Sequence, residues 1–257
     1  MVQSLRVVEA NARVYKRTWR GSVVTAFLNP VLFLLAMGLG LGSIIDSNPG
    51  AEGLGGVRYV SFIASGLLAA TAMQTGAVEG SWPVLAGIKW VKTYHAALAT
   101  PVRVSDLVTG NLLWMAVRVA LSAVAFAIDS AVLGVLAPID VLAALPAAIL
   151  TGMAFAAPIT AYTALAKDET RLAAVFRFAI LPMFLFSGTF FPIEQLPGWL
   201  QPVAYVTPLW HGVELCRSSA IGFDTALHPI AHLGYLLAWA SAGWWFARQN
   251  LGKRLQP

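Results

Sequence analysis

The segment from Phe184 to Arg217, FLFSGTFFPIEQLPGWLQPVAYVTPLWHGVELCR, decides the fold of this chain. It is rich in aromatic and aliphatic residues, yet it carries prolines at positions 192, 197, 202 and 208. A proline inside a helix removes a hydrogen bond and clashes with the preceding turn, and a backbone exposed to lipid cannot leave its polar groups unpaired. The segment is therefore too apolar for a loop in open water and too broken for one plain membrane crossing.

The part from 191 to 222 predicts short helices that dip into the outer edge of a membrane and return before the last span. Thr207 followed by Pro208 is typical of a helix N-cap with proline at the first helical position. These signals predict one half-helix at about 197–205 and a second at about 208–219.

The composition places the whole chain in a membrane. Apolar residues make up 58% of it and charged residues only 11%, whereas soluble domains are about one quarter charged. We expect an all-α integral membrane protein whose single domain covers 1–257. No cleavable signal peptide is predicted, because the first apolar run is too long for one. A bilayer crossing needs about 20 apolar residues, and the pattern predicts six spans, at about 22–45, 59–80, 107–128, 141–166, 172–190 and 229–247.

The basic residues predict the orientation. Most of the 17 lysines and arginines lie before the first span, between spans two and three, between spans four and five, and after span six. The positive-inside rule therefore places both termini in the cytoplasm. A basic chain can also bind nucleic acid, but these charges follow the membrane loops instead of forming one patch, so no nucleic-acid partner is expected.

Residues 1–21 are predicted to form an amphipathic helix in the plane of the interface. Leu5, Val8, Ala12, Tyr15 and Trp19 recur at spacings of three and four, and basic residues occupy the other faces. Two interpretations stay open at this point: an elbow that holds the cytoplasmic entrance beside the lipid headgroups, or a simple anchor.

A second cytoplasmic helix is predicted between spans two and three, within residues 82–101. Ser81 can cap it, Pro83 suits its first turn and Pro101 ends it. Ile88, Val91, His95 and Leu98 would form one apolar face. Such a helix, fixed to two spans, can transmit force if a partner grips it; the alternative is a surface linker.

Motifs for chemistry are scarce. The sequence contains no G-x-x-x-x-G-K-[ST], so it cannot build a P-loop phosphate cradle. His228 and His232 have the spacing of paired zinc ligands, but no glutamate lies between them, and neither a metal nor a catalytic residue is predicted. Arg118 and Asp129 are buried-charge candidates on nearly the same face of span three, roughly 16 Å apart; structural pairing is favoured over substrate binding for Arg118.

Two blocks of residues give these features a family. The chain resembles the ABC transporter type-2 permeases, in the branch of nodulation lipo-oligosaccharide exporters and daunorubicin-type drug exporters. The first block is Thr93-Tyr94-His95-Ala96-Ala97-Leu98-Ala99-Thr100-Pro101 with Asp106, Gly110 and Trp114, and the second is Phe186-Ser187-Gly188-Thr189-Phe190-Phe191-Pro192 with Leu196-Pro197 and 208–217, PLWHGVELCR.

The resemblance implies a dimer of permease subunits, homomeric or heteromeric, above two P-loop ATPase subunits. ATP and Mg would bind to those partners, and this chain would hold no cofactor. The helix within 82–101 would be the coupling helix that enters a groove on the ATPase. Its implied contact residues are Trp82, Lys89, Trp90, Lys92, Thr93, Tyr94, His95 and Pro101.

The resemblance also implies that spans one and five line the route of the cargo, and that the outer half-helices cap its exit. Aromatic and methionine side chains on the route would suit amphipathic cargo, although ordinary helix packing uses the same residues. The implied path residues are Phe27, Asn29, Phe33, Phe178, Met183 and Phe184, and the implied outer gate consists of Phe190, Phe191, Pro192, Trp199, Trp210, His211 and Glu214.

The function expected from the sequence is that of a permease subunit in the bacterial cytoplasmic membrane. Its ATP-driven exporter would move lipid-like, glycolipid or hydrophobic drug molecules out of the cytoplasm or the inner leaflet. One alternative is a membrane-embedded lipid-modifying enzyme that uses Glu194, His211 and Glu214 at the outer face. Another is a non-enzymatic scaffold or channel.

Overall fold

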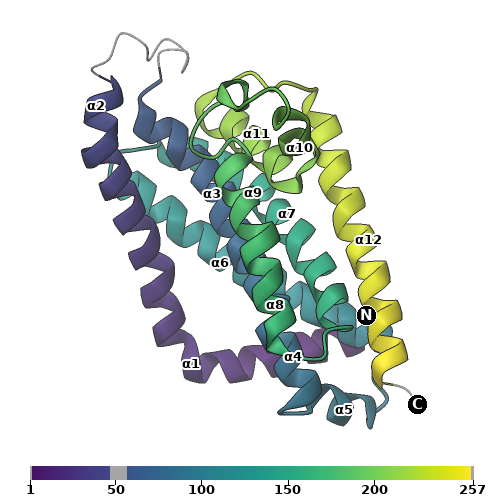
Figure 1. Cartoon of the computed structure of the whole chain (residues 1–257). Coiled ribbons are helices and arrows are strands. Elements are labelled where there is room, and N and C mark those ends of the chain that lie inside the picture. Colours follow the sequence, from purple (N-terminus) through teal and green to yellow (C-terminus); the bar gives the residue numbers. More distant parts are fainter. Residues whose placement is uncertain (1, 47–56, 256–257) are drawn as a thin grey trace.

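The computed structural model describes residues 2–46 and 57–255, and within these ranges it consists of helices and their connections, with no strand. Long helices run side by side, and both chain ends lie at the same end of the bundle (Figure 1). The prediction of an all-helical protein is thus confirmed. The elements are α1 (Val2–Leu35), η1 (Ala36–Gly42), α2 (Ser43–Asp46), α3 (Tyr59–Glu79), α4 (Trp82–Lys89), α5 (Thr93–Leu98), α6 (Val104–Val132), α7 (Pro138–Thr163), α8 (Glu169–Val175), η3 (Phe176–Ile180), α9 (Leu181–Phe186), η4 (Ile193–Gln195), α10 (Gln201–Val206), α11 (Pro208–Ile221) and α12 (Pro229–Leu255).

Four of these helical stretches are long and apolar enough to cross a membrane: Val2–Gly38, Tyr59–Lys89, Val104–Val132 and Pro138–Thr163. They overlap the first four predicted spans, although the first and fourth predicted spans extend further, to 45 and 166. The rod formed by α8, η3 and α9 lies beside them along the bundle, as does α12 (Figure 1). These two elements are not among the four stretches, so the count of six spans stays a prediction. The fifth predicted span differs from a plain helix, because the π-helical turn η3 interrupts it.

The predicted interface helix and the first predicted span belong to one continuous helix, α1, from Val2 to Leu35. A bend within α1 lies between them. Figure 1 shows its two arms at a steep angle. The first arm contacts α6 through polar side chains: Ser4 Oγ donates to Asp106 Oδ1 (3.3 Å), and Asn11 Nδ2 donates to Asn111 Oδ1 (2.9 Å). The predicted apolar stripe is divided: Leu5 and Trp19 are 62% and 45% exposed, whereas Tyr15 packs on Trp114 of α6 with ring centres 5.6 Å apart.

The predicted single helix within 82–101 is wrong, because the structure has two short helices, α4 and α5, with a break between them. Lys92 has a left-handed backbone (φ 57°) at this break, a conformation that non-glycine residues adopt at a cost of about 1 kcal/mol. The break turns the chain so that the Tyr94 ring packs on Gly87, where a side chain would meet the ring. Tyr94 is buried, whereas Val91 and His95 of the predicted apolar face are exposed.

The half-helices of the outer segment are present as α10 and α11. As predicted, Thr207 caps α11, and its Oγ1 accepts a hydrogen bond from the Trp210 N–H (3.4 Å). The first half-helix begins at Gln201 instead of 197, because Pro197 starts a turn in which its carbonyl accepts from the Leu200 N–H (2.8 Å). α11 is mostly buried and packs against α3, α7 and α12.

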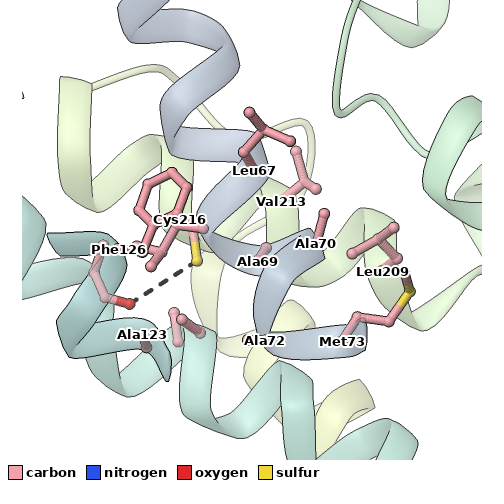
Figure 2. Close-up of a cluster of buried hydrophobic side chains, with 14 of the residues drawn as sticks. Leu67, Ala69, Ala70, Ala72, Met73, Ala123, Phe126, Leu209, Val213 and Cys216 are labelled. Carbon is pink, nitrogen blue, oxygen red and sulfur yellow. Dashed lines mark hydrogen bonds between the residues drawn. The ribbon is translucent and has the colours of Figure 1, made fainter. Parts of the chain in front are cut away.

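Small residues let these helices approach closely. Figure 2 shows α3, α6 and α11 meeting through Leu67, Met73, Phe126, Leu209 and Val213, with alanines between them. Cys216 belongs to this cluster as a buried packing residue, and its Sγ lies 3.9 Å from the Ala144 carbonyl.

One close crossing joins α3 and α7, where Gly76 lies against Gly152. A Cβ atom built at Gly76 would overlap the backbone carbonyl of Gly152, which cannot move without shifting α7. Small residues at such crossings are how membrane helices gain close packing.

We predict that Gly76→Ala destabilises the protein by about 2 kcal/mol, because it overpacks this crossing. Thermal unfolding of the detergent-solubilised chain measures the effect. The matched control is Gly234→Ala on α12, where no atom lies within 4 Å of the new methyl group. Equal melting temperatures for the two variants would contradict the proposed role of the crossing.

Candidate functional site

A cavity of about 460 Å³ lies between α1, α3 and α6, and α9 contributes Phe184 to its wall. Three predicted path residues, Phe27, Asn29 and Phe33, also line it. Thr71, Gln74, Thr75 and Ser122 add hydroxyl and amide groups to the same wall. The cavity therefore combines an aromatic part with a polar part.

The polar part contains a partly buried ion pair. Arg118 Nε donates to Glu79 Oε1 (2.8 Å), and the side chains are only 18% and 14% exposed. The guanidinium also lies 4.3 Å from the centre of the Tyr15 ring, and its Nη2 donates to Ser22 Oγ (3.4 Å). One arginine thus links α3 and α6 to α1.

Structural pairing was the favoured interpretation of Arg118, and the structure identifies its partner as Glu79 on a different span. The other buried-charge candidate, Asp129, does not pair with it. Asp129 is 6% exposed, and its Oδ2 has no hydrogen-bond partner within the described residues. Glu79 could have been suspected from the sequence, because it is a carboxylate at the end of an apolar span.

Two phenylalanines of the cavity wall, Phe33 and Phe184, form an aromatic cluster with Phe190, which does not itself line the cavity. Ring centres are 6.2 Å apart for Phe33 and Phe184, 6.0 Å for Phe33 and Phe190, and 5.1 Å for Phe184 and Phe190. The structure therefore joins predicted path residues to Phe190 of the predicted outer gate. Two other path residues do not line the cavity: Phe178 is 82% exposed, and Met183 packs against the core.

The remaining outer-gate residues differ in their exposure to solvent. Trp210 and His211 are buried, while Phe191 and Pro192 are half-buried and Trp199 is 76% exposed. Trp210 and His211 belong to an aromatic cluster between α11 and α12. Trp199 is exposed and does not share this buried environment.

His211 connects α11 to α12. Its Nδ1 lies 2.9 Å from Nδ1 of His232, and its ring stacks on Tyr235 with centres 4.0 Å apart. His232 therefore contacts His211 instead of forming a site with His228, which is exposed at the start of α12. Among the described residues no group of three or more His, Cys, Asp or Glu side chains could hold a metal ion.

Glu214 and Arg217 hold the outer segment in place. Glu214 Oε2 accepts from the Ala226 N–H (3.0 Å), and Glu214 Oε1 lies 3.8 Å from Arg217 Nη1. Arg217 Nη2 donates to the Gly188 carbonyl (2.8 Å), and the guanidinium lies 3.8 Å from the centre of the Phe62 ring. Sequence reasoning did not identify the role of Arg217.

The predicted ATPase contacts lie at the opposite end of the bundle, on α4, α5 and their flanks. Trp90, Lys92, Thr93, His95 and Pro101 are exposed there. The other three contacts are engaged within the chain. Lys89 Nζ donates to the Lys167 carbonyl (3.3 Å), the Trp82 ring lies 4.8 Å from Phe176, and Tyr94 is buried.

We predict that Arg118→Met lowers the free energy of unfolding by about 3 kcal/mol, because it leaves the buried Glu79 carboxylate without its partner. The double variant Arg118→Met/Glu79→Gln should lose less than the sum of the two single changes. Thermal unfolding in detergent gives the coupling. As a control, Arg13→Met breaks an exposed pair with Glu9 and should cost less than about 0.5 kcal/mol; additive effects at Arg118 and Glu79 would contradict a buried pair.

Comparison with known proteins gives this architecture a family. A model of the ABC-2 type transporter family matches residues 3–221. The chain is 30% identical to nodulation protein J of Rhizobium meliloti (strain 1021), over 98% of this chain and 94% of the relative. It is 29% identical to nodulation protein J of Rhizobium leguminosarum bv. trifolii (98% and 93% covered) and 31% identical to that of R. leguminosarum bv. viciae (90% and 87% covered). The chain therefore belongs to the ABC-2 type transporter family and is a multi-pass membrane subunit of an ABC transporter.

Proposed function

We propose that this chain is the permease of an ATP-driven exporter that moves lipid-like, glycolipid or hydrophobic drug molecules out of the cytoplasm or the inner leaflet. The observation that carries the proposal is the cavity between α1, α3 and α6. Its polar wall around Arg118 and Gln74 suits a head group, and its aromatic wall around Phe33 and Phe184 suits an apolar tail.

The energy for transport comes, in this proposal, from a separate P-loop ATPase that binds ATP and Mg. The chain has no P-loop of its own. Trp90, Lys92 and His95 are exposed on a tip made of two short helices tied to α3 and α6. A partner that grips this tip would pull on both long helices, because α4 follows α3 directly and α5 leads into α6.

A complete transporter would contain two permease subunits and two ATPases, and we propose that the two permeases are identical. Apolar side chains are exposed on α1 and on the α8–η3–α9 rod, including Leu28, Leu32, Phe178 and Leu181. These side chains favour contact of this side with a second subunit or with lipid. The bacterial cytoplasmic membrane is the proposed location, with both termini on the cytoplasmic side.

The alternative of a lipid-modifying enzyme finds less support in the outer segment. Two of its three candidate groups are committed to structural contacts, since His211 contacts His232 and Tyr235, and Glu214 contacts Arg217 and the Ala226 backbone. Glu194 is exposed.

We predict that Trp90→Ala weakens co-purification with the co-expressed ATPase about tenfold, because it removes an exposed aromatic anchor from the tip. Trp239→Ala, on the exposed side of α12, is the matched control and should leave co-purification unchanged. Quantitative pull-down in detergent measures both. Tyr94→Ala should instead lower the melting temperature, because Tyr94 is buried; an intact complex with Trp90→Ala would count against the tip as the contact.

We predict that Phe184→Ala raises the KM for daunorubicin-stimulated ATP hydrolysis of the reconstituted transporter about tenfold, with kcat largely retained, because one ring of the aromatic cluster is lost. Phe246→Ala, whose side chain is 53% exposed on α12, serves as the control. A KM that stays the same in both variants would show that the cavity does not hold the apolar part of this cargo.

A further inference from the structure

A second cavity, of about 770 Å³, lies between the start of α6 and the last turns of α12. It plays no part in the proposed route. Its wall carries three cationic side chains, Arg103, Arg248 and Lys253, together with Trp245 and Gln249, and no carboxylate lines it. Positive charge is therefore concentrated in a cavity built from two segments that are far apart in the sequence.

These three cations are not used to hold the fold together. Within the described residues, none of their side chains makes a hydrogen bond or an ion pair; Arg248 lies 6.0 Å from the Trp244 ring. Arg254, one residue after Lys253, shows the contrast. Its Nη1 donates to the carbonyls of Thr163, Ala164 and Ala166 at the end of α7 (3.1, 2.8 and 2.7 Å).

The acidic group in the first turn of α6 is already engaged. Asp106 accepts hydrogen bonds from the Arg103 backbone N–H (3.4 Å) and from Ser4 Oγ (3.3 Å). It therefore caps α6 and fastens α1, and within the described residues it forms no ion pair with the cationic side chains that line the cavity.

The position along the helices places this cavity at the level of lipid headgroups. α6 has 29 residues and α12 has 27, so each is roughly 40 Å long, and the hydrocarbon core of a bilayer measures about 30 Å. In the proposed six-span topology both helices cross the bilayer, and their extra length extends into the headgroup layer. Trp245 in the cavity wall is 56% exposed and Phe246 beside it is 53% exposed, which is typical of aromatic residues at the membrane interface.

We propose that this cavity binds the phosphate group of an anionic phospholipid, with the lipid tails along the exposed aromatic side of α12. Arginine forks match phosphate oxygens, and lysine adds a point charge. A soluble phosphate would use the same cations, but it would leave Trp245 and Phe246 without a partner. A bound lipid would bridge α6 and α12 at the end of the bundle that carries the α4–α5 tip.

The test uses the full chain in neutral detergent and titrates it with phosphatidylglycerol, and native mass spectrometry gives the dissociation constant. Each cation near a phosphate contributes about fivefold in affinity. The variant Arg103→Gln/Arg248→Gln/Lys253→Gln should therefore bind phosphatidylglycerol about 100-fold more weakly. Arg248→Gln alone removes one exposed side chain that makes no hydrogen bond within the described residues, and it should weaken binding about fivefold. This single variant still tests the site if the triple variant fails to fold.

A matched control removes the same amount of charge elsewhere on the chain. Arg6→Gln/Lys16→Gln/Arg20→Gln changes three exposed cations of α1 that do not line the cavity, and it should weaken binding less than threefold. An equal loss in the two triple variants would overturn the site in favour of diffuse attraction to a basic protein. Full binding by the cavity variant would overturn it as well.

Two further titrations identify the source of the phosphate. Phosphatidylcholine should bind at least tenfold more weakly than phosphatidylglycerol, and millimolar inorganic phosphate should fail to displace phosphatidylglycerol. Displacement by inorganic phosphate at that concentration would overturn the assignment to a lipid.

Discussion

A bilayer core offers no hydrogen-bond partners to a polypeptide backbone, and this constraint explains both the helices and the places where they stop. Some irregular backbone is covered by protein instead of solvent. Between α9 and α11, for example, Ser187, Gly188 and Thr189 are buried, and Arg217 donates to the Gly188 carbonyl from behind. The outer segment is therefore possible because a buried arginine replaces the bond that a helix would have supplied. Gly66 of α3 helps to accommodate the same segment, because a side chain there would overlap the Thr189 carbonyl.

Charged residues make up only 11% of this chain, and their positions differ between the interior and the surface. Arg118 and Glu79 neutralise each other at the cavity between α1, α3 and α6, and they leave a polar surface without an unpaired ion. Arg103, Arg248 and Lys253, at the ends of α6 and α12, form no ion pair within the described residues, and their side chains are exposed. The Arg118–Glu79 pair thus lies at the wall of the cavity between α1, α3 and α6, whereas the exposed cations carry the contacts that we propose with lipid and with the ATPase.

Local signals in the sequence predicted the elements well and predicted the contacts between them poorly. Thr207 and Pro208 located the start of α11, because a cap is a property of neighbouring residues. The break at Lys92 carries no glycine or proline, and it arises from the packing of the Tyr94 ring on Gly87, which no local pattern reveals. The contacts between α1 and α6 were not predicted either, because Ser4 and Asn11 form hydrogen bonds to residues about 100 positions away. For the same reason Glu79 was not recognised as the partner of Arg118.

The central claim is that this chain forms a route through the membrane and takes its energy from another subunit. The most direct measurement places the purified chain in proteoliposomes, with and without its ATPase, and follows both ATP hydrolysis and movement of an amphipathic dye. The account predicts dye transport only when both subunits and ATP are present, and no hydrolysis by this chain alone. Hydrolysis by the chain alone, or equal dye flux without the ATPase, would contradict it.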